Sequence, residues 1–256
     1  MPAIETDGLT KTYGDHTAID EVTFTVRDGE VFGFLGPNGA GKSTTIGVLL
    51  GFVAPSRGTA TVLGHDVETA PRAVRGRVGS LPDGDALYDE LTGVEHLRLA
   101  GDLRGVDVDA AELVDRVGLS TEAAKRSAGT YSTGMRRRLA LALALAGDPD
   151  LLVLDEPTSG LDPDGVSRLE RIVRATADGG ATVFFSSHAL SHVEAVCDRV
   201  GILDGGRLAA VGSFDELRTT ADAGAADRSL RALFDAYTSD RNSETARLGV
   251  RDGEVT

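Results

Sequence analysis

The residues with the clearest chemistry form a glycine-rich loop near the start of the chain. Gly36 to Ser43, GPNGAGKS, fits the pattern G-x-x-x-x-G-K-[ST] without a misfit. Backbone N–H groups of such a loop point inward and form a cradle for anions, and the helix that follows adds its positive N-terminal end. Lys42 can reach the outer phosphates of a nucleotide, and the Ser43 hydroxyl can bind a magnesium ion. The loop therefore predicts a nucleotide phosphate site.

Two adjacent carboxylates follow a second apolar segment. Leu151 to Leu154 reads as a buried parallel strand, and Asp155 and Glu156 stand at its end. A carboxylate at a strand tip can hold magnesium, usually through water. The next carboxylate can face the terminal phosphate and take a proton from the attacking water. Neighbouring acids at a buried strand end are costly unless a cation offsets their charge, which favours a metal site over a surface pair.

A third motif, Tyr131-Ser132-Thr133-Gly134-Met135, opens a helical segment. Ser132 is a good N-cap, and Gly134 lets a backbone N–H approach a phosphate closely. Alone, the motif indicates only a helix cap. Its position between the glycine loop and the acidic strand end, with Ser132 placed 23 residues before Asp155, adds a nucleotide-contacting interpretation.

The surrounding pattern predicts an α/β fold with a β-rich antiparallel front and a helical lobe. Alternation and apolar runs predict strands in 3–35, 58–63, 77–81, 151–154 and 181–186, and a hairpin in 199–211. Helical periodicity predicts helices within 94–146 and in 166–177, 189–197, 214–219 and 230–237. Residues 238–256 are polar and predict a frayed tail.

With these segments in place, the chain resembles the ATP-binding cassette (ABC) ATPase family across about residues 3–220. GPNGAGKST looks like the Walker A loop of that family, LLVLDEPTSGLD like its Walker B strand and D-loop, and YSTGM like its signature motif. Ser186-Ser187-His188 looks like its switch histidine. The resemblance implies a P-loop NTPase fold with a nucleotide-binding domain in 1–220, whose helical subdomain spans about 84–147. Residues 221–256 are then a short helical extension and polar tail.

The resemblance also implies roles for single residues toward ATP and Mg²⁺. Glu156 is the general base, Asp155 supports the metal together with Ser43, and His188 contacts the γ-phosphate. Ser132 and Gly134 meet a nucleotide held by the partner subunit. The phosphates are held by Gly36, Asn38, Gly39, Ala40, Gly41, Lys42, Ser43 and Thr44.

Two further positions follow from the same resemblance. Tyr13, 29 residues before Lys42, looks like the aromatic residue that stacks on adenine, against the alternative of an ordinary turn tyrosine. The family has a glutamine after the strand at 77–81, yet this chain contains no glutamine. Asp83 is the best match and is expected to contact metal or water; the alternative is a simple Pro-Asp-Gly turn.

Because the chain carries one set of motifs, the resemblance implies that two subunits pair head to tail, as a homodimer or a paired cassette. The implied function is ATP hydrolysis that drives a separate membrane permease docking near residues 83–100. LPDGDALYDELTGVEHL and the C-terminal extension resemble cassettes of the ABC-2 exporter group. The alternatives are a soluble non-transport cassette ATPase acting in translation, repair or assembly, and a regulatory module that does not hydrolyse ATP.

Composition sets the expected surroundings of the chain. No apolar run approaches the roughly 20 residues of a membrane span, and the N-terminus lacks a secretory pattern, so we expect a cytoplasmic protein peripheral to the membrane. A net charge of −14 argues against general nucleic-acid binding. The three residues Arg136 to Arg138 are interpreted as a solvated helix face or domain contact rather than a phospholipid site, and Cys197 as a buried thiol.

The bias within the charged residues predicts adaptation to a salty cytosol. Arginine outnumbers lysine 23 to 3, and aspartate outnumbers glutamate 26 to 14. High salt shortens the range of self-repulsion on such an acidic surface. The alternative is an ordinary acidic protein from a GC-rich genome.

Overall fold

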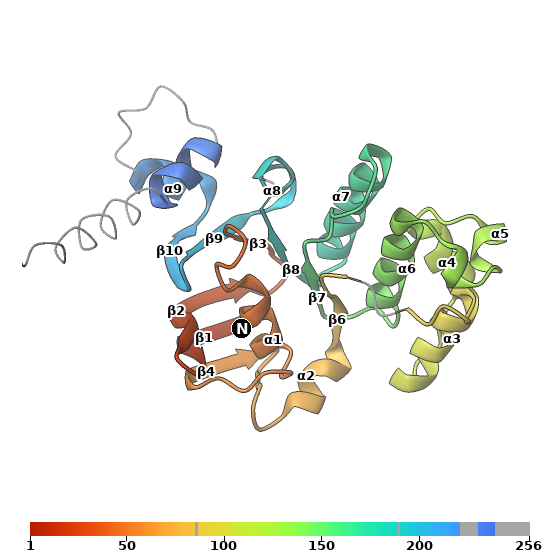
Figure 1. Cartoon of the computed structure of the whole chain (residues 1–256), viewed down its shortest axis with the longest axis horizontal. Coiled ribbons are helices and arrows are strands. Elements are labelled where there is room, and N and C mark those ends of the chain that lie inside the picture. The colour runs from red at the N-terminus through yellow and green to blue at the C-terminus, as the bar shows by residue number, and fades with distance from the viewer. Residues whose placement is uncertain (85–86, 189, 221–229, 239–256) are drawn as a thin grey trace, which may run out of the picture.

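The computed structural model describes residues 1–84, 87–188, 190–220 and 230–238 (Figure 1). Its front sheet is antiparallel, in the order β2-β1-β4-β5. The strands are β1 (Pro2–Tyr13), β2 (His16–Arg27), β4 (Arg57–Val62) and β5 (His65–Asp66). Buried and exposed residues alternate along β2, as expected for a sheet with one covered face.

The second sheet has the order β10-β9-β3-β8-β7-β6. Its strands are β3 (Val31–Leu35), β6 (Val78–Leu81), β7 (Leu151–Asp155), β8 (Thr182–Ser187), β9 (Arg199–Asp204) and β10 (Arg207–Gly212). The first five are parallel, and β10 joins the edge antiparallel to β9. Because β3 and β7 are buried along their whole length, their sequences are continuous apolar runs rather than alternating ones.

Four phenylalanine rings join the two sheets. Phe24 on β2 packs against Phe32 and Phe34 on β3 and Phe184 on β8, with ring centroids 5.5 to 6.1 Å apart. Burial of large apolar rings dominates the energetics of such a contact. The front sheet is thereby fixed against the strand that leads into the glycine loop.

A separate helical lobe extends beyond β6 (Figure 1). Its helices are α3 (Gly93–Arg104), α4 (Ala110–Arg116), α5 (Thr121–Ala124) and α6 (Thr133–Leu145). Thr92 and Glu95 form a capping box at the start of α3, which satisfies backbone donors that the helix leaves unpaired. Leu139 and Leu145 of α6 are buried in the same apolar cluster as Leu97 of α3 and Leu81 of β6. The lobe is therefore packed onto the sheet through α6.

The remaining helices accompany the sheets. They are α1 (Lys42–Leu49), α2 (Pro71–Arg77), α7 (Pro163–Asp178), α8 (Leu190–Val196) and α9 (Phe214–Thr220), and residues 230–238 form one more helix. Within the described residues, no helix combines the length and apolar character that crossing a bilayer requires.

The α/β class with an antiparallel front sheet and helical parts is confirmed. Some boundaries differ from the predicted ones. Helix α7 starts at Pro163 rather than Val166, because Asp162 accepts the Gly165 N–H as its N-cap and proline fits the first helical turn. Arg77 ends α2, which the periodicity does not predict, and is not part of a strand. The predicted polar tail, most of the extension and residue 189 lie outside the described residues.

Candidate functional site

The glycine loop connects β3 to α1 and has a backbone that only glycine adopts easily. Gly41 has φ 105°, and an added Cβ would lie 2.5 Å from the Ala18 carbonyl oxygen. Gly39 has φ 81° and would meet nothing within 4 Å. A side chain at Gly41 would clash with the front sheet, whereas Gly39 faces open space. The loop is thus held from behind and left clear on the side where a phosphate would lie.

Lys42 is buried, with 6% of its surface exposed, and its ammonium lies at the centre of the site. Its Nζ donates to the carbonyl oxygens of Gly36 at 2.7 Å and Pro37 at 3.3 Å. The same Nζ forms an ion pair with Glu156 Oε1 at 3.2 Å. The glycine loop and the acidic end of β7 therefore meet at a single cation.

The ends of β7 and β8 hold the carboxylates. In their parallel register Asp155 stands beside Ser186, and the buried Ser186 hydroxyl is hydrogen-bonded to the Asp155 carboxylate. The Glu156 N–H donates to the same Ser186 oxygen at 3.1 Å. Ser186 orients both acidic residues, a role that its place in the SSH motif does not reveal from sequence.

Glu156 also contacts His188, the predicted residue at the end of β8. Its Oε2 lies 2.8 Å from His188 Nδ1 and 3.4 Å from the His188 backbone nitrogen. Glu156 has φ 46°, an uncommon conformation for a residue with a side chain. Lys42, Glu156 and His188 are far apart in sequence. In the structure they form one cluster, in which the Glu156 carboxylate lies between the Lys42 ammonium and the His188 imidazole.

The donor set fits a magnesium ion held mainly by phosphate. The Ser43 side chain is exposed beside Lys42, and Asp155 is 4% exposed at the tip of β7. Across the part of the chain that the structure describes, no three His, Cys, Asp or Glu side chains lie close enough to hold a metal, and Asp83 belongs to no such group. Mg²⁺ commonly takes one or two protein ligands and completes its shell with phosphates and water. Ser43 and Asp155 would be those ligands.

Asp83 is exposed in the loop after β6, and the structure does not join it to the Lys42 cluster. The carbonyls on either side of it, those of Pro82 and Gly84, accept hydrogen bonds from Arg137 Nη1 at 2.7 and 3.1 Å. The predicted metal contact of Asp83 stays a prediction.

The other predicted site residues lie on separate elements. Ser132 caps α6 by accepting the Met135 N–H at 3.3 Å, and both Ser132 and Gly134 are in the helical lobe, away from α1 (Figure 1). Tyr13 is 47% exposed at the end of β1, with Lys11 Nζ 5.0 Å from its ring centroid. One chain does not bring these residues to Lys42, and their contacts with nucleotide stay predictions.

The structure also shows what Tyr131, the first residue of the YSTGM motif, and Arg137 contact. Tyr131 is 8% exposed, and its hydroxyl donates to the Ala123 carbonyl at 2.7 Å, so it acts as a core residue of the helical lobe. Burial raises the pKa of this hydroxyl above its ordinary value. Of the two alternatives for Arg136 to Arg138, a solvated helix face or a domain contact, Arg137 fits the second, because it is 6% exposed and donates to carbonyls of the loop after β6 and of the end of β7.

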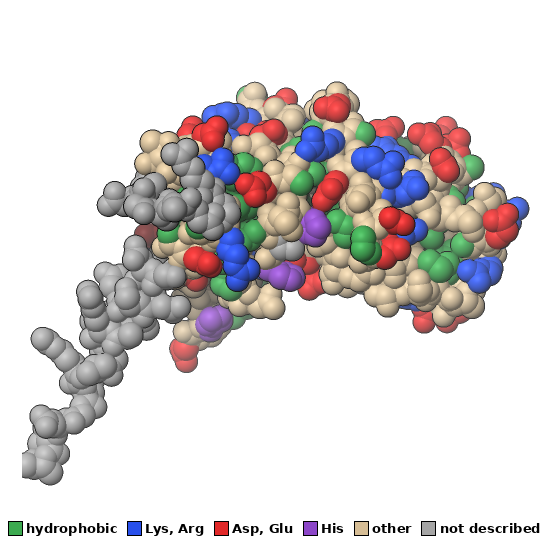
Figure 2. Space-filling view, turned by 90° about the horizontal axis from the view of Figure 1, so that it is seen from above, with side chains coloured by type: hydrophobic (Ala, Val, Ile, Leu, Met, Phe, Trp, Pro, Cys, Tyr) green, Lys and Arg blue, Asp and Glu red, His purple; other side chains and the backbone are tan. Residues whose placement is uncertain are grey.

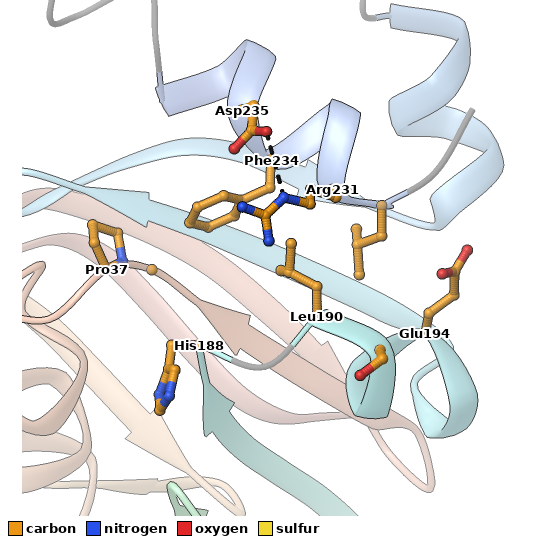
Figure 3. A pocket seen from close by; sticks show the side chains of 10 residues that line it. Pro37, His188, Leu190, Glu194, Arg231, Phe234 and Asp235 are labelled. Carbon is orange, nitrogen blue, oxygen red and sulfur yellow. Dashed lines mark ion pairs between the residues drawn. The ribbon is translucent and has the colours of Figure 1, made fainter. Parts of the chain in front are cut away.

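A pocket of about 590 Å³ lies beside the glycine loop (Figure 3). Pro37 of the glycine loop and His188 of the Lys42 cluster line one side of it, and Leu190 and Glu194 of α8 line another. The helix at 230–238 covers it with Phe234 and with Arg231, whose Nε lies 3.9 Å from Asp235 Oδ2. Residues 230–238, the described part of the extension, are therefore packed next to the site.

Comparisons with known proteins agree with this geometry. A family model described as ABC transporter matches residues 19–159. The daunorubicin/doxorubicin resistance ATP-binding protein of Streptomyces peucetius is 44% identical over 223 residues, covering 85% of this chain and 67% of that protein. The chain thus spans about two thirds of that relative's length.

Two solved structures share the fold. An ATP-binding subunit of an ABC transporter superposes with a TM-score of 0.84 at 32% identity, covering 92% of this chain and 99% of that one. A dimeric ATP-binding cassette in a post-hydrolysis state with ADP and Pi has a TM-score of 0.75 at 23% identity, covering 82% and 98%. The second likeness concerns the fold alone.

The family match and the similarity to the resistance protein agree with an ATP site at the glycine loop and at the cluster of Lys42, Glu156 and His188. The chain belongs to the ABC transporter family, as an ATP-binding and ATP-hydrolysing subunit.

Proposed function

We propose that this chain binds and hydrolyses MgATP between two subunits and that the closing and opening of the pair drives a separate membrane permease for export. The observation that carries the proposal is the cluster in which Lys42 Nζ lies 3.2 Å and His188 Nδ1 lies 2.8 Å from the Glu156 carboxylate. A cation for phosphate, a base for water and a histidine at the strand end are the groups that hydrolysis of a phosphoanhydride needs.

In this proposal each residue of the site has one task. The loop amides from Gly36 to Thr44 bind the phosphates, and Lys42 neutralises their charge. Glu156 accepts a proton from the attacking water at its carboxylate, and His188 donates toward the γ-phosphate. Tyr13 stacks on adenine. When bound through Ser43 and Asp155, Mg²⁺ offsets the phosphate charge that develops in the reaction.

The positions of the motifs in the chain support the pairing of two subunits. Ser132 and Gly134 are exposed or half-buried at the start of α6 and lie in a different lobe from Lys42 (Figure 1). A second subunit, placed head to tail, brings its own Ser132 and Gly134 against the nucleotide on Lys42. The dimeric cassette with ADP and Pi, similar in fold, supports such a pair. Closure excludes bulk water, and loss of phosphate removes the charge between the two faces.

The permease is proposed to dock on the segment 83–100. Tyr88 in that segment is 61% exposed, although large aromatic side chains are usually covered. Its backbone N–H donates to His96 Nε2 at 2.9 Å, which fixes the segment on α3. The relative that confers daunorubicin/doxorubicin resistance supports export as the direction. The chain then lies at the cytoplasmic face of the membrane, and the permease selects the cargo.

The variant Glu156→Gln tests the proposal because it keeps the shape of the side chain and removes its basicity. We expect turnover to fall by about 10²-fold or more. We also expect ATP to hold the variant as a closed dimer, visible as a doubled mass in light scattering with ATP and a single mass with ADP.

Two results would contradict the proposal. One is a Glu156→Gln variant that stays monomeric at every ATP concentration. The other is ATP turnover in that variant equal to that of the unmodified chain.

A further inference from the structure

Arg137 is a buried arginine whose two neighbours in sequence are paired at the surface. Arg136 Nη1 lies 2.7 Å from Asp89 Oδ1, and Arg138 Nη2 lies 2.9 Å from Asp162 Oδ1. Arg137 is 6% exposed and lies on the face of α6 that also buries Leu141 and Ala144. Burying a charged side chain is costly unless its donors form hydrogen bonds. The hydrogen-bond partners of Arg137 therefore explain its buried position.

The Arg137 guanidinium donates to four backbone carbonyls in two distant segments. Nη1 donates to Pro82 at 2.7 Å and to Gly84 at 3.1 Å. Nη2 donates to Asp155 at 2.6 Å and to Glu156 at 2.7 Å. The rigid planar fork of arginine suits two such pairs, whereas the single ammonium of lysine cannot span both.

These contacts connect three parts of the molecule. One pair of carbonyls brackets Asp83, at the start of the proposed permease-docking segment. The other pair belongs to Asp155 and Glu156 at the end of β7. The side chain itself belongs to the helix that Ser132 caps. A shift of the helical lobe or of the Asp83 loop therefore acts on the backbone of Glu156.

We propose that Arg137 is a positioning residue that sets the Glu156 carboxylate for catalysis and couples it to the Asp83 loop. This inference rests on the proposed function, in which Glu156 is the base. The backbone of Glu156 has φ 46°, and the hydrogen bond to its carbonyl helps to hold it there. The carboxylate then lies between Lys42 and His188. The hydrogen bonds of Arg137 described above reach neither of those side chains. Arg137 therefore acts on Glu156 through the backbone.

The test is Arg137→Lys, which keeps the charge and most of the volume. We expect kcat to fall by about tenfold or more, while KM for ATP and the Kd for a fluorescent ATP analogue change by less than about threefold. Stimulation of ATPase activity by the permease in membrane vesicles should fall with kcat. A residue needed only for folding would lower the melting temperature and the fraction of active protein without this split between kcat and KM.

Arg136→Lys is the matched control, because the same substitution one residue earlier on α6 alters a surface pair with Asp89. It should leave kcat within about twofold of the unmodified value. Should Arg137→Lys fold poorly, Arg137→Ala with millimolar guanidinium provides a second measurement. Guanidinium should restore part of kcat, and methylammonium at the same concentration should not.

The Glu156→Gln background separates the positioning role of Arg137 from the proposed function. Since Arg137 acts through Glu156, adding Arg137→Lys to Glu156→Gln should lower turnover no further. An unchanged kcat in Arg137→Lys, or a loss that multiplies with that of Glu156→Gln, would overturn the positioning role while leaving the proposed function intact. Full turnover in Glu156→Gln alone would instead overturn the proposed function.

Discussion

Glu156 is the residue on which the site converges. Its carboxylate is shared between Lys42 and His188, its N–H is held by Ser186 and its carbonyl by Arg137. Backbone held in a sparsely populated conformation persists only when surrounding contacts fix it, and such residues concentrate at active sites. Here a hydroxyl and a guanidinium supply those contacts, and both come from elements outside β7.

At the scale of a single residue, Tyr88 tests where the permease docks. Tyr88→Ala removes an exposed ring whose neighbour is His96, 6.1 Å away between centroids. We expect basal ATPase activity within about twofold of the unmodified chain and permease affinity lower by about tenfold or more, since aromatic anchors dominate interfaces. Co-purification with the permease from detergent extracts measures the affinity.

The control for Tyr88 is Leu103→Ala, which truncates an apolar side chain that is 79% exposed at the end of α3, outside the docking segment. It should leave co-purification unchanged. Equal recovery of permease with Tyr88→Ala and Leu103→Ala would place the docking surface elsewhere.

At the scale of elements, the contact between α6 and β6 positions α6, the helix that starts within the YSTGM motif. Gly79 lies on β6 directly under α6, and a Cβ built on it would lie 1.9 Å from the Ala144 carbonyl oxygen. The obstacle is backbone, so the helix itself would have to move. The spacing of the lobe from the sheet therefore depends on the absence of one side chain.

Gly79→Ala should lower the free energy of unfolding by about 3 kcal/mol, at the upper end of the cost of overpacking. Gly76→Ala is its control: a Cβ there meets nothing within 4 Å, and the residue is inside α2. It should be neutral or stabilise by about 0.5 to 1 kcal/mol. Urea unfolding of both variants measures the difference, and a Gly79→Ala variant as stable as Gly76→Ala would show that α6 can shift without cost.

The parts of the site that sequence predicts are those that the chain places locally. Gly36 to Ser43 is one uninterrupted loop, and the apolar run before Asp155 fixes that residue at a strand end. Parallel strands then bring the ends of β7 and β8 together, which accounts for the meeting of Glu156 and His188. The α/β class follows from the same runs and periods.

The contacts of Arg137 could not be predicted from the sequence, because the carbonyls to which it donates are backbone groups that any sequence would supply. A signal did exist: it precedes Leu141 and Ala144 by four and seven residues, the spacing of one helix face. Ser186 is similar, because its register opposite Asp155 is a property of strand pairing. Asp83 lies on a surface loop, where no periodicity constrains the direction of a side chain.

The distribution of charge belongs to the whole molecule. Acidic and basic side chains are spread over the face shown in Figure 2, and no single-sign patch covers it. On this face, the charge of a chain with net charge −14 acts as a diffuse repulsion rather than as a local site. Screening by salt acts on that kind of repulsion.

We predict that the melting temperature rises by about 5 °C or more between 0.1 and 2 M KCl, because the screening length falls from about 10 Å at 0.1 M to about 3 Å at 1 M and less above it. Differential scanning calorimetry measures the change. Sucrose, which stabilises by exclusion and not by screening, serves as the comparison. A melting temperature that is flat in KCl would favour the ordinary acidic protein from a GC-rich genome.

The ion pair between Lys42 and Glu156 has a consequence for the order of events. One ammonium, 3.2 Å from the carboxylate, is also the group that an arriving triphosphate needs, so the two anions compete for it. In the proposed function, a triphosphate that takes the ammonium leaves the Glu156 carboxylate without this counter-ion. Arrival of the nucleotide and release of Glu156 from Lys42 are then a single exchange of partners, so that the carboxylate is freed for water only when a phosphate is there for water to attack.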